Sequence, residues 1–336
     1  MESGNYEVTR PTVLVLASDV LFPHFFSVES QKKLDAVTDW RHCAVREDSP
    51  VLREQIANAD VLMTTWHTPF LTVDMLGPEP RVRLIAHCGG EVKSRVAEQV
   101  FDFVTVTNAA EPMARGVAEM ALALALTLIR RIPQYASEMR NGVVRTNAEV
   151  SSGETLFGRT VGLVGFGRIG RAFAKLVEPF DVRLLVNDPF VSAPEQGATL
   201  VELEDLIRSS SIIVLAAALT PETVHLIDKR RLSLMSDGTV LINVARGGLI
   251  DTQALLEELR TGRLTAALDV TDPLEPLPVD HELRRLTNVI LTPHIASGGL
   301  EVRREMGAIA VDEVIRFANG QPPLNRVTHE MLATMT

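Results

Sequence analysis

The chain has 336 residues, of which 46% are hydrophobic and 23% charged, a composition typical of a soluble globular protein with room for two domains. Its formal net charge of −10 and pI near 5.4 argue against nucleic acid or an anionic membrane as a general partner. Two cysteines give no disulfide framework, and the polar N-terminus has no apolar signal core. We therefore expect a cytoplasmic protein without a bound metal.

Short apolar runs alternate with amphipathic segments along the whole chain, which predicts parallel sheets covered by helices on both faces. In the first part, strands are expected at 12–17, 60–65, 83–88 and 104–108. Helices are expected around 28–37, 51–58 and 93–100.

The segment 117–129 is the most apolar of the chain, but its uncharged part covers only residues 120–129. That is about half of the ~20 residues that a bilayer requires. A helix that is apolar all round must be buried, either inside the protein or against a second copy. We expect burial and, through the helix 113–131, a homodimer.

The rest of the chain repeats the alternation of strands and helices. Strands are expected at 160–165, 182–187, 211–216, 239–244, 265–270 and 288–291. The helix 251–260 has Asp251 as a plausible N-cap and Gly262 just past its end, and one more helix is expected at 301–319.

The most informative motif is Gly165-Phe-Gly167-Arg-Ile-Gly170, which lies between a strand pattern and the helical pattern of 168–177. In such a turn the first glycine permits a tight bend, the second lets the backbone approach a pyrophosphate, and the third lets helix and strand pack closely. Asp188 ends the next apolar run, where its carboxylate can accept hydrogen bonds from both ribose hydroxyls. The flanking strand and helix patterns favour a dinucleotide site over a plain surface turn. The Asp188 carboxylate would repel a 2′-phosphate, so the dinucleotide is expected to be NAD.

The motif lies in mid-chain, which favours an insertion of one doubly wound unit into another. The terminal helix 301–319 has no strand partner of its own and would return to the first unit. We therefore predict a Rossmann NAD-binding domain at 113–299, inserted into a flavodoxin-like substrate domain made of 1–112 and 300–336. Ligands of such sheets lie at the carboxyl ends of the strands, so the site is expected in the cleft between the units.

Three residues of the second unit follow predicted strands: Arg246, Glu275 and His294. Their surroundings are Asn-Val-Ala-Arg-Gly-Gly, then Ala-Leu-Asp-Val with Glu-Pro a few residues on, then Thr-Pro-His-Ile-Ala. Each residue alone could be an ordinary surface side chain. In this order after a dinucleotide motif, the set resembles the D-isomer-specific 2-hydroxyacid dehydrogenase family, and the likeness covers nearly the whole chain.

The resemblance implies NAD-dependent interconversion of a 2-oxo acid and a D-2-hydroxy acid. Hydride transfer at C2 must be accompanied by a proton at the C2 oxygen, and an imidazole suits that proton transfer near neutral pH. His294 is therefore expected as the acid/base, with Glu275 holding its ring and favouring the protonated form. Arg246 would polarise the keto oxygen and bind the substrate carboxylate through its planar fork of donors.

The remaining site residues are also implied by the resemblance. We expect the cofactor to contact Gly165, Gly167, Arg168, Ile169, Gly170, Asp188, Thr220, Asn243, Ala245 and Asp269, the last as acceptor for the nicotinamide carboxamide. In the first unit, the segment 84–93 resembles the family's strand-to-loop segment whose backbone N–H groups bind the substrate carboxylate. Together with Arg246, the substrate-binding residues would be Gly89, Gly90, Glu91 and Trp66. For Trp66, packing in the core or between domains is an equal alternative.

Three departures from the family pattern bear on the site. The acidic loop has one residue more than usual before Glu275, which makes Asp272 a reserve candidate. The strand ending near 214–221 lacks the usual His-Pro, so one cofactor-side contact is missing. Lys93 replaces a frequent aspartate and, with Arg95, could favour a doubly acidic substrate, although surface exposure is the simpler interpretation.

Two other functions compete with this hypothesis. Formate dehydrogenase shares the fold, but that branch is expected to carry a glutamine where Glu275 stands. A redox-sensing binding protein, similar to the family's transcriptional corepressors, would keep the cofactor site for regulation. No basic patch in the sequence supports that alternative.

Overall fold

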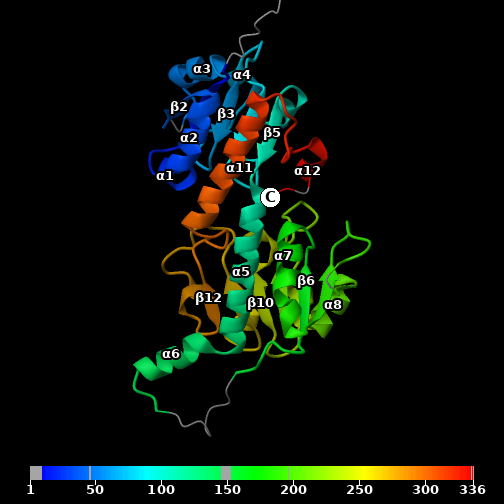
Figure 1. Cartoon of the computed structure of the whole chain (residues 1–336). Coiled ribbons are helices and arrows are strands. Elements are labelled where there is room, and N and C mark those ends of the chain that lie inside the picture. Colours follow the sequence, from blue (N-terminus) through cyan, green and yellow to red (C-terminus); the bar gives the residue numbers. More distant parts are fainter. Residues whose placement is uncertain (1–9, 45–46, 145–152, 196, 334, 336) are drawn as a thin grey trace, which may run out of the picture. The chain divides into compact units, whose positions relative to one another are not determined.

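The computed structural model describes residues 10–44, 47–144, 153–195, 197–333 and 335. The chain forms two compact units, one from Met1–Met113 with Gly299–Thr336 and one from Ala114–Gly298. Each unit contains one parallel sheet with helices on both faces (Figure 1). The predicted fold class, one doubly wound α/β unit inserted into another, is confirmed.

The first unit has a five-stranded parallel sheet in the order β2-β1-β3-β4-β5, the order of flavodoxin-like folds. Its strands are β1 Thr12–Leu16, β2 Asp39–Cys43, β3 Val61–Thr64, β4 Leu84–His87 and β5 Thr105–Asn108. Its helices are α1 Phe22–Phe25, α2 Val28–Val37, α3 Pro50–Ala57, α4 Val73–Leu76, the 3-10 helix η1 Glu98–Asp102, α11 Leu300–Ala318 and α12 His329–Ala333.

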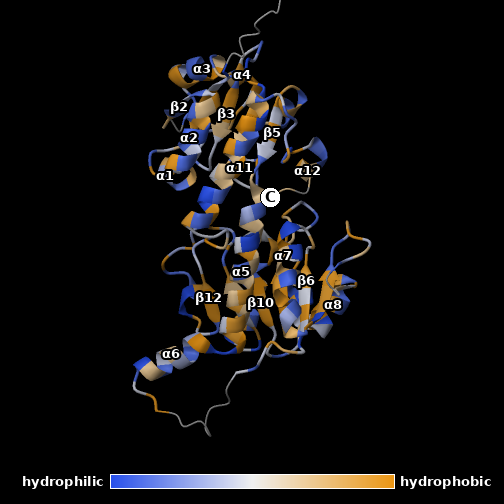
Figure 2. Ribbon diagram, in the orientation of Figure 1, coloured by the Kyte–Doolittle hydropathy of each residue, from blue (hydrophilic) through white to orange (hydrophobic). Residues whose placement is uncertain are grey.

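Two hydrophobic layers enclose the sheet of the first unit. One layer packs α3, α4 and α12 against the strands, and the other packs α1, α2 and α11 against the opposite face. The terminal helix α11 fits closely because Gly307 has no side chain: a Cβ there would lie 1.9 Å from the Phe25 carbonyl oxygen. The inner strands β1, β3 and β4 are mainly hydrophobic, whereas the covering helices combine hydrophobic and hydrophilic residues (Figure 2).

The second unit has a seven-stranded parallel sheet in the order β12-β11-β10-β9-β6-β7-β8. Its strands are β6 Thr160–Val164, β7 Arg183–Asn187, β8 Thr199–Leu200, β9 Ile212–Leu215, β10 Val240–Asn243, β11 Thr265–Leu268 and β12 Val289–Leu291. Its helices are α6 Ile132–Arg140, α7 Arg168–Val177, η2 Glu178–Phe180, α8 Leu203–Ser209, α9 Lys229–Leu234, η3 Gly247–Leu249, α10 Thr252–Arg260 and η4 Glu282–Arg285. The strand order reverses between β6 and β9, which is where such sheets bind ligands.

The apolar helix α5, Ala110–Ile129, packs one side into the core of the second unit together with α7. By length and composition it is the one helix among the described residues that could cross a membrane, and half of its most apolar window is buried inside the protein. The opposite core layer of the unit is formed by α8, α9 and α10. The expected burial of this helix inside the protein therefore holds for one of its sides.

The predicted helix at 93–100 is wrong. Val92, Val96 and Val100 are buried at the spacing of a helix, but only a single turn forms after Val92. The chain then pairs with Leu71, which donates to the Arg95 carbonyl and accepts from the Ala97 N–H. The apolar spacing was correct, but pairing with a distant residue replaced the helix.

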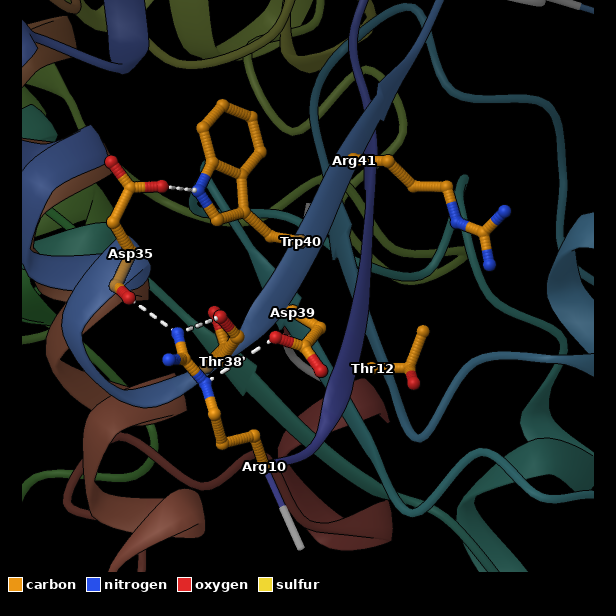
Figure 3. Close-up of a pocket in the computed structure, with 7 residues that line it drawn as sticks. All are labelled: Arg10, Thr12, Asp35, Thr38, Asp39, Trp40 and Arg41. Carbon is orange, nitrogen blue, oxygen red and sulfur yellow. Dashed lines mark hydrogen bonds and ion pairs between the residues drawn. The ribbon is translucent and has the colours of Figure 1, made fainter.

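One hollow of about 520 Å³ lies at the amino ends of β1 and β2 (Figure 3). Its polar groups mostly satisfy one another: Arg10 bonds the carbonyls of Asp35 and Thr38 and pairs with Asp39. The Trp40 Nε1–H donates to an Asp35 carboxylate oxygen at 2.7 Å. The candidate site residues of this unit lie at the carboxyl ends of the strands. The hollow therefore lies at the opposite edge of the sheet.

Candidate active site

The glycine-rich turn joins β6 to α7 at the strand-order reversal. Gly165 has φ +95°, and a Cβ there would lie 2.6 Å from the Ala217 nitrogen, so the position requires glycine. A Cβ at Gly170 would lie 2.3 Å from the Gly165 carbonyl oxygen, so helix and strand could not approach as they do. Gly167 has no atom within 4 Å of such a Cβ, which leaves open space above the helix N-terminus.

The N-terminus of α7 offers backbone donors to that space. Gly167 is the N-cap and makes no side-chain cap. The first N–H groups of a helix, here those of Arg168, Ile169 and Gly170, have no acceptor within the helix. Together with the helix dipole, they fit the pyrophosphate of a dinucleotide.

Asp188 follows β7 and connects the turn to the next loop. One carboxylate oxygen accepts from the Phe166 N–H at 2.7 Å, and the other accepts from the Phe190 N–H at 2.8 Å. Each oxygen retains acceptor capacity for a hydroxyl. The carboxylate is therefore fixed beside the glycine-rich turn, where ribose hydroxyls would be expected.

Arg246 lies in the turn after β10 and is half-buried. Its Nη1 donates to the Ala245 carbonyl at 2.8 Å. The fully buried Asn243 holds this turn from below: its amide donates to the Arg246 carbonyl at 2.8 Å and accepts from the Ala245 N–H at 3.1 Å. The observed contacts of Asn243 thus position Arg246, and its contact with the cofactor stays a prediction.

Asp269 follows β11 and is 1% exposed. Its carboxylate accepts from the Thr292 hydroxyl at 2.6 Å and from the N–H groups of Ile295 and Ala296 at 2.9 and 2.8 Å. Its own carbonyl accepts from the His294 N–H at 2.9 Å. Asp269 therefore holds the loop that carries His294, and a bond to the nicotinamide carboxamide stays a prediction.

His294 has φ +53°, the left-handed region that residues other than glycine rarely adopt. Asp269 accepts hydrogen bonds from Thr292 before His294 and from Ile295 and Ala296 after it, and these bonds stabilise this conformation. Its Nδ1 forms a hydrogen bond with the carboxylate of Glu275, and both side chains remain partly exposed. The longer acidic loop therefore still brings Glu275, and not the reserve candidate Asp272, to the imidazole.

Gly247 brings the Arg246 turn against the acidic loop. A Cβ at Gly247 would lie 2.2 Å from the Thr271 carbonyl carbon, so only glycine allows this approach. Thr271 in turn donates its N–H to Glu275 at 3.3 Å. The turns after β10, β11 and β12 thus form one connected group at the carboxyl edge of the sheet.

In the first unit, the turn after β4 has the features of an anion site. Within the described residues, no backbone hydrogen bond is donated by the N–H of Gly89, Gly90 or Glu91. The carbonyls of the two glycines are held by Ala109 and Asn108, and the Glu91 carboxylate accepts from Ser94. Successive N–H groups fixed in this way suit a carboxylate.

Three other candidate residues are also placed by the structure. Trp66 is half-buried beside Phe25, with ring centroids 5.2 Å apart and the planes nearly perpendicular. Thr220 lies in a turn where Thr223 Oγ1 accepts from its N–H at 2.7 Å. Lys93 is exposed. Core packing thus accounts for one face of the Trp66 ring, and its contact with substrate stays a prediction.

Comparison with known proteins identifies the family of the chain. Residues 122–296 match the model of the D-isomer specific 2-hydroxyacid dehydrogenase, NAD binding domain. The chain belongs to the D-isomer specific 2-hydroxyacid dehydrogenase family. Its second unit therefore contains the family's NAD-binding domain, and NAD is the cofactor.

Related proteins cover most of the chain. A glyoxylate reductase of Thermococcus onnurineus is 34% identical over 294 residues, which are 84% of this chain and 86% of the relative. A D-3-phosphoglycerate dehydrogenase of Archaeoglobus fulgidus is 36% identical over 228 residues, but only 43% of that protein is covered. The solved structure of the TT0316 protein from Thermus thermophilus has a TM-score of 0.79 and 32% identity, and covers 94% of this chain and all of the other.

Several residues that shape the site were missed by sequence reasoning. They are Thr292, which bonds Asp269, and His87, which bonds Thr64 beneath the Gly89 turn. A buried hydroxyl or imidazole has no periodic pattern of its own. The one available signal was the position of each at the carboxyl end of a predicted strand.

Proposed function

We propose that the protein is an NAD-dependent oxidoreductase that interconverts a 2-oxo acid and a D-2-hydroxy acid. The observation that carries this proposal is the His294–Glu275 pair, whose histidine is on a loop fixed by Asp269, in a unit that matches the family's NAD-binding domain. An acid/base beside a nicotinamide site is what hydride exchange at a C–O bond requires.

The roles of the residues follow from their contacts. NADH, when bound, supplies the hydride that adds to C2 of the oxo acid. Glu275 bonds Nδ1 of His294, so Nε2 is the nitrogen left to donate a proton to the C2 oxygen. In the oxidative direction the same nitrogen would accept that proton while NAD⁺ takes the hydride from C2.

Two groups are proposed to bind the substrate carboxylate and keto oxygen. The N–H groups of Gly89, Gly90 and Glu91 would bind the carboxylate, because they are successive donors on a fixed turn. Arg246 would add its planar fork of N–H donors and stabilise negative charge on the C2 oxygen. In this proposal the first unit, 1–112 with 300–336, binds substrate and the unit 113–299 binds NAD.

We also propose that the protein is a cytoplasmic homodimer that assembles through the helix 113–131. The support comes from Met120, Leu122 and Leu126 of α5, which this single chain buries only in part, and from α6, which buries none of its residues. Light scattering at micromolar concentration tests the assembly, since a mass of one chain of 36.8 kDa would contradict it.

The reaction is tested by mixing the protein with NADH and a panel of 2-oxo acids: glyoxylate, hydroxypyruvate, phosphohydroxypyruvate, and bulky aliphatic and aromatic members. Oxidation of NADH with at least one acid, and formation of the D-isomer alone, is the expected result. If NADH binds and no acid is reduced, the protein is a regulatory NADH-binding member of the family instead.

A further inference from the structure

After α11 the chain returns to the sheet of the first unit. Residues 324–333 and 335 are here called the strap, and its first residues pair antiparallel with β5, the edge strand of that sheet. The Val327 N–H donates to the Val106 carbonyl at 2.8 Å, and the Asn108 N–H donates to the Asn325 carbonyl at 3.1 Å. The strap is therefore bonded to the strand that lies next to β4.

A buried carboxylate on α11 anchors the strap. Glu313 is 2% exposed, and it accepts from the N–H groups of Leu324 and Asn325 at 3.1 and 2.8 Å and from the Asn325 side-chain amide at 2.7 Å. Among the described residues, all partners of this carboxylate are N–H groups of the strap. Burial of a charge is costly, and an apolar side chain would attach the strap at a lower cost. What the carboxylate adds is a fixed position, because its hydrogen bonds are directional.

The strap reaches the turn after β4 through Asn108. This residue ends β5, is 5% exposed, and its side-chain amide donates to the Gly90 carbonyl at 2.6 Å. In a trans peptide the carbonyl and the N–H point in opposite directions. The Gly90 carbonyl shares a trans peptide with the Glu91 N–H, so its bond to Asn108 sets the direction of that N–H. Glu313, Asn325 and Asn108 thus form one chain of hydrogen bonds that ends at the turn.

A second contact of the strap holds the other end of the turn. The Val92 N–H donates to Met335 Sδ at 3.4 Å, and Val92 is fully buried. Thioether sulfur is a weak acceptor, but it is the one acceptor that this N–H has among the described residues. Leu332 of α12 packs in the same hydrophobic layer as Val92. Residues 89–91 therefore lie between two points that the strap fixes.

We propose that the strap is a positioning element of the substrate site, which aims the N–H groups of residues 89–91 at the substrate carboxylate. This inference rests on the proposed function, because that function assigns the carboxylate to these N–H groups. Glu313, Asn108 and Met335 act through the turn and not on the substrate. Every 2-oxo acid has the same carboxylate, so a displaced strap should weaken all of them by a similar factor, mainly through KM.

The test measures steady-state kinetics with NADH for every acid of the panel that the wild type reduces. Glu313→Leu removes the anchor and should lower kcat/KM by about 10- to 30-fold for each acid, chiefly by raising KM. Glu313→Gln keeps one oxygen that can accept both bonds from Asn325, and should lose less than about 3-fold. This recovery by the conservative variant is what a positioning role requires.

Met335→Leu removes the acceptor of the Val92 N–H but keeps an apolar side chain of similar volume. It should lower kcat/KM by about 3- to 10-fold for each acid. Met75→Leu, in the same hydrophobic layer, is the matched control and should change kcat/KM by less than about 2-fold. The Kd of NADH, measured by fluorescence, should stay within about 2-fold of wild type in all variants, because NAD binds in the other unit.

Met335→Leu decides the outcome if Glu313→Leu does not fold. Kinetics of Met335→Leu equal to those of Met75→Leu, a matching loss of NADH affinity, or losses that differ widely between acids would overturn the inference and leave the proposed reaction intact. If the wild type reduces no acid of the panel, the proposed reaction itself is refuted, and the inference with it.

Discussion

Replacement of Asp269 by asparagine tests whether this residue acts by holding the His294 loop. The carboxylate accepts three hydrogen bonds, two at one oxygen from Thr292 and Ile295 and one at the other from Ala296. In Asp269→Asn, one of those oxygens becomes an NH₂ donor. If the asparagine oxygen keeps the bonds from Thr292 and Ile295, its NH₂ group faces the Ala296 N–H. Two donors then meet, and neither has an acceptor.

The cost can be worked out from these contacts. A hydrogen bond to a charged group contributes roughly 1.5–3 kcal/mol, and a buried N–H left without an acceptor costs about 1–3 kcal/mol. We expect the free energy of unfolding to fall by about 2–4 kcal/mol. Because His294 keeps its left-handed conformation through these bonds, kcat should fall by about 100-fold, the effect of a displacement of about 1 Å at a reacting group.

The assay combines urea unfolding, steady-state kinetics and NADH binding by fluorescence. Thr292→Val is the matched control, since it removes one of the three bonds without adding a donor, and should cost about 1 kcal/mol. NADH affinity in Asp269→Asn should stay within about threefold of wild type. A variant with normal kcat and NADH binding weakened by tenfold or more would refute this reasoning and make Asp269 chiefly a cofactor contact.

The remaining predictions concern the glycine turn, the acid/base and the buried imidazole. Gly165→Ala should abolish NADH binding because its Cβ has no room at φ +95°, whereas Gly167→Ala should fold normally and only weaken binding; equal affinities in the two variants would contradict this. His294→Ala should abolish turnover and leave NADH affinity unchanged, so retained turnover would remove it from the acid/base role. Burial lowers the pKa of His87 to about 3, below its unfolded value of about 6.5, so its stabilising contribution is complete above pH ~6.5 and is lost as the pH falls toward 3. Unfolding free energies measured at pH 7 and pH 5 should therefore fall by up to about 2 kcal/mol more in wild type than in Thr64→Val/His87→Phe, and parallel falls would contradict it.

Local sequence signals predicted those elements whose structure depends on neighbouring residues. The helices 28–37 and 168–177 form with the predicted bounds, and Asp251 caps α10 by accepting from the N–H groups of Gln253 and Ala254. The edge strands β2 and β8 were missed, since Asp39–Cys43 has a mostly polar sequence and Thr199–Leu200 is too short for a pattern. The helix at 93–100 was wrong because Leu71, a distant residue, pairs with that segment.

The candidate site shows the same division between local and distant information. The glycine turn could be assigned because its three positions have separate steric requirements, and the structure shows two crowded positions and one open one. The bonds of Asp269 to Ile295 and Ala296 join residues more than 25 positions apart, so no spacing rule indicates them. A carboxylate after a strand was visible in the sequence, but what it bonds was not.

Asn243 and Asp269 together explain how the second unit can present two candidate catalytic side chains with little freedom. Each is a buried polar residue at the end of its strand, and each bonds the backbone of a turn that carries a candidate catalytic residue, Arg246 or His294. Side chains on such turns are positioned by hydrogen bonds that most substitutions would break, so these turns should tolerate little change. A change of substrate should therefore be easier to engineer in the first unit, at Trp66, whose described ring contacts are with Phe25 and Arg303 rather than with these turns.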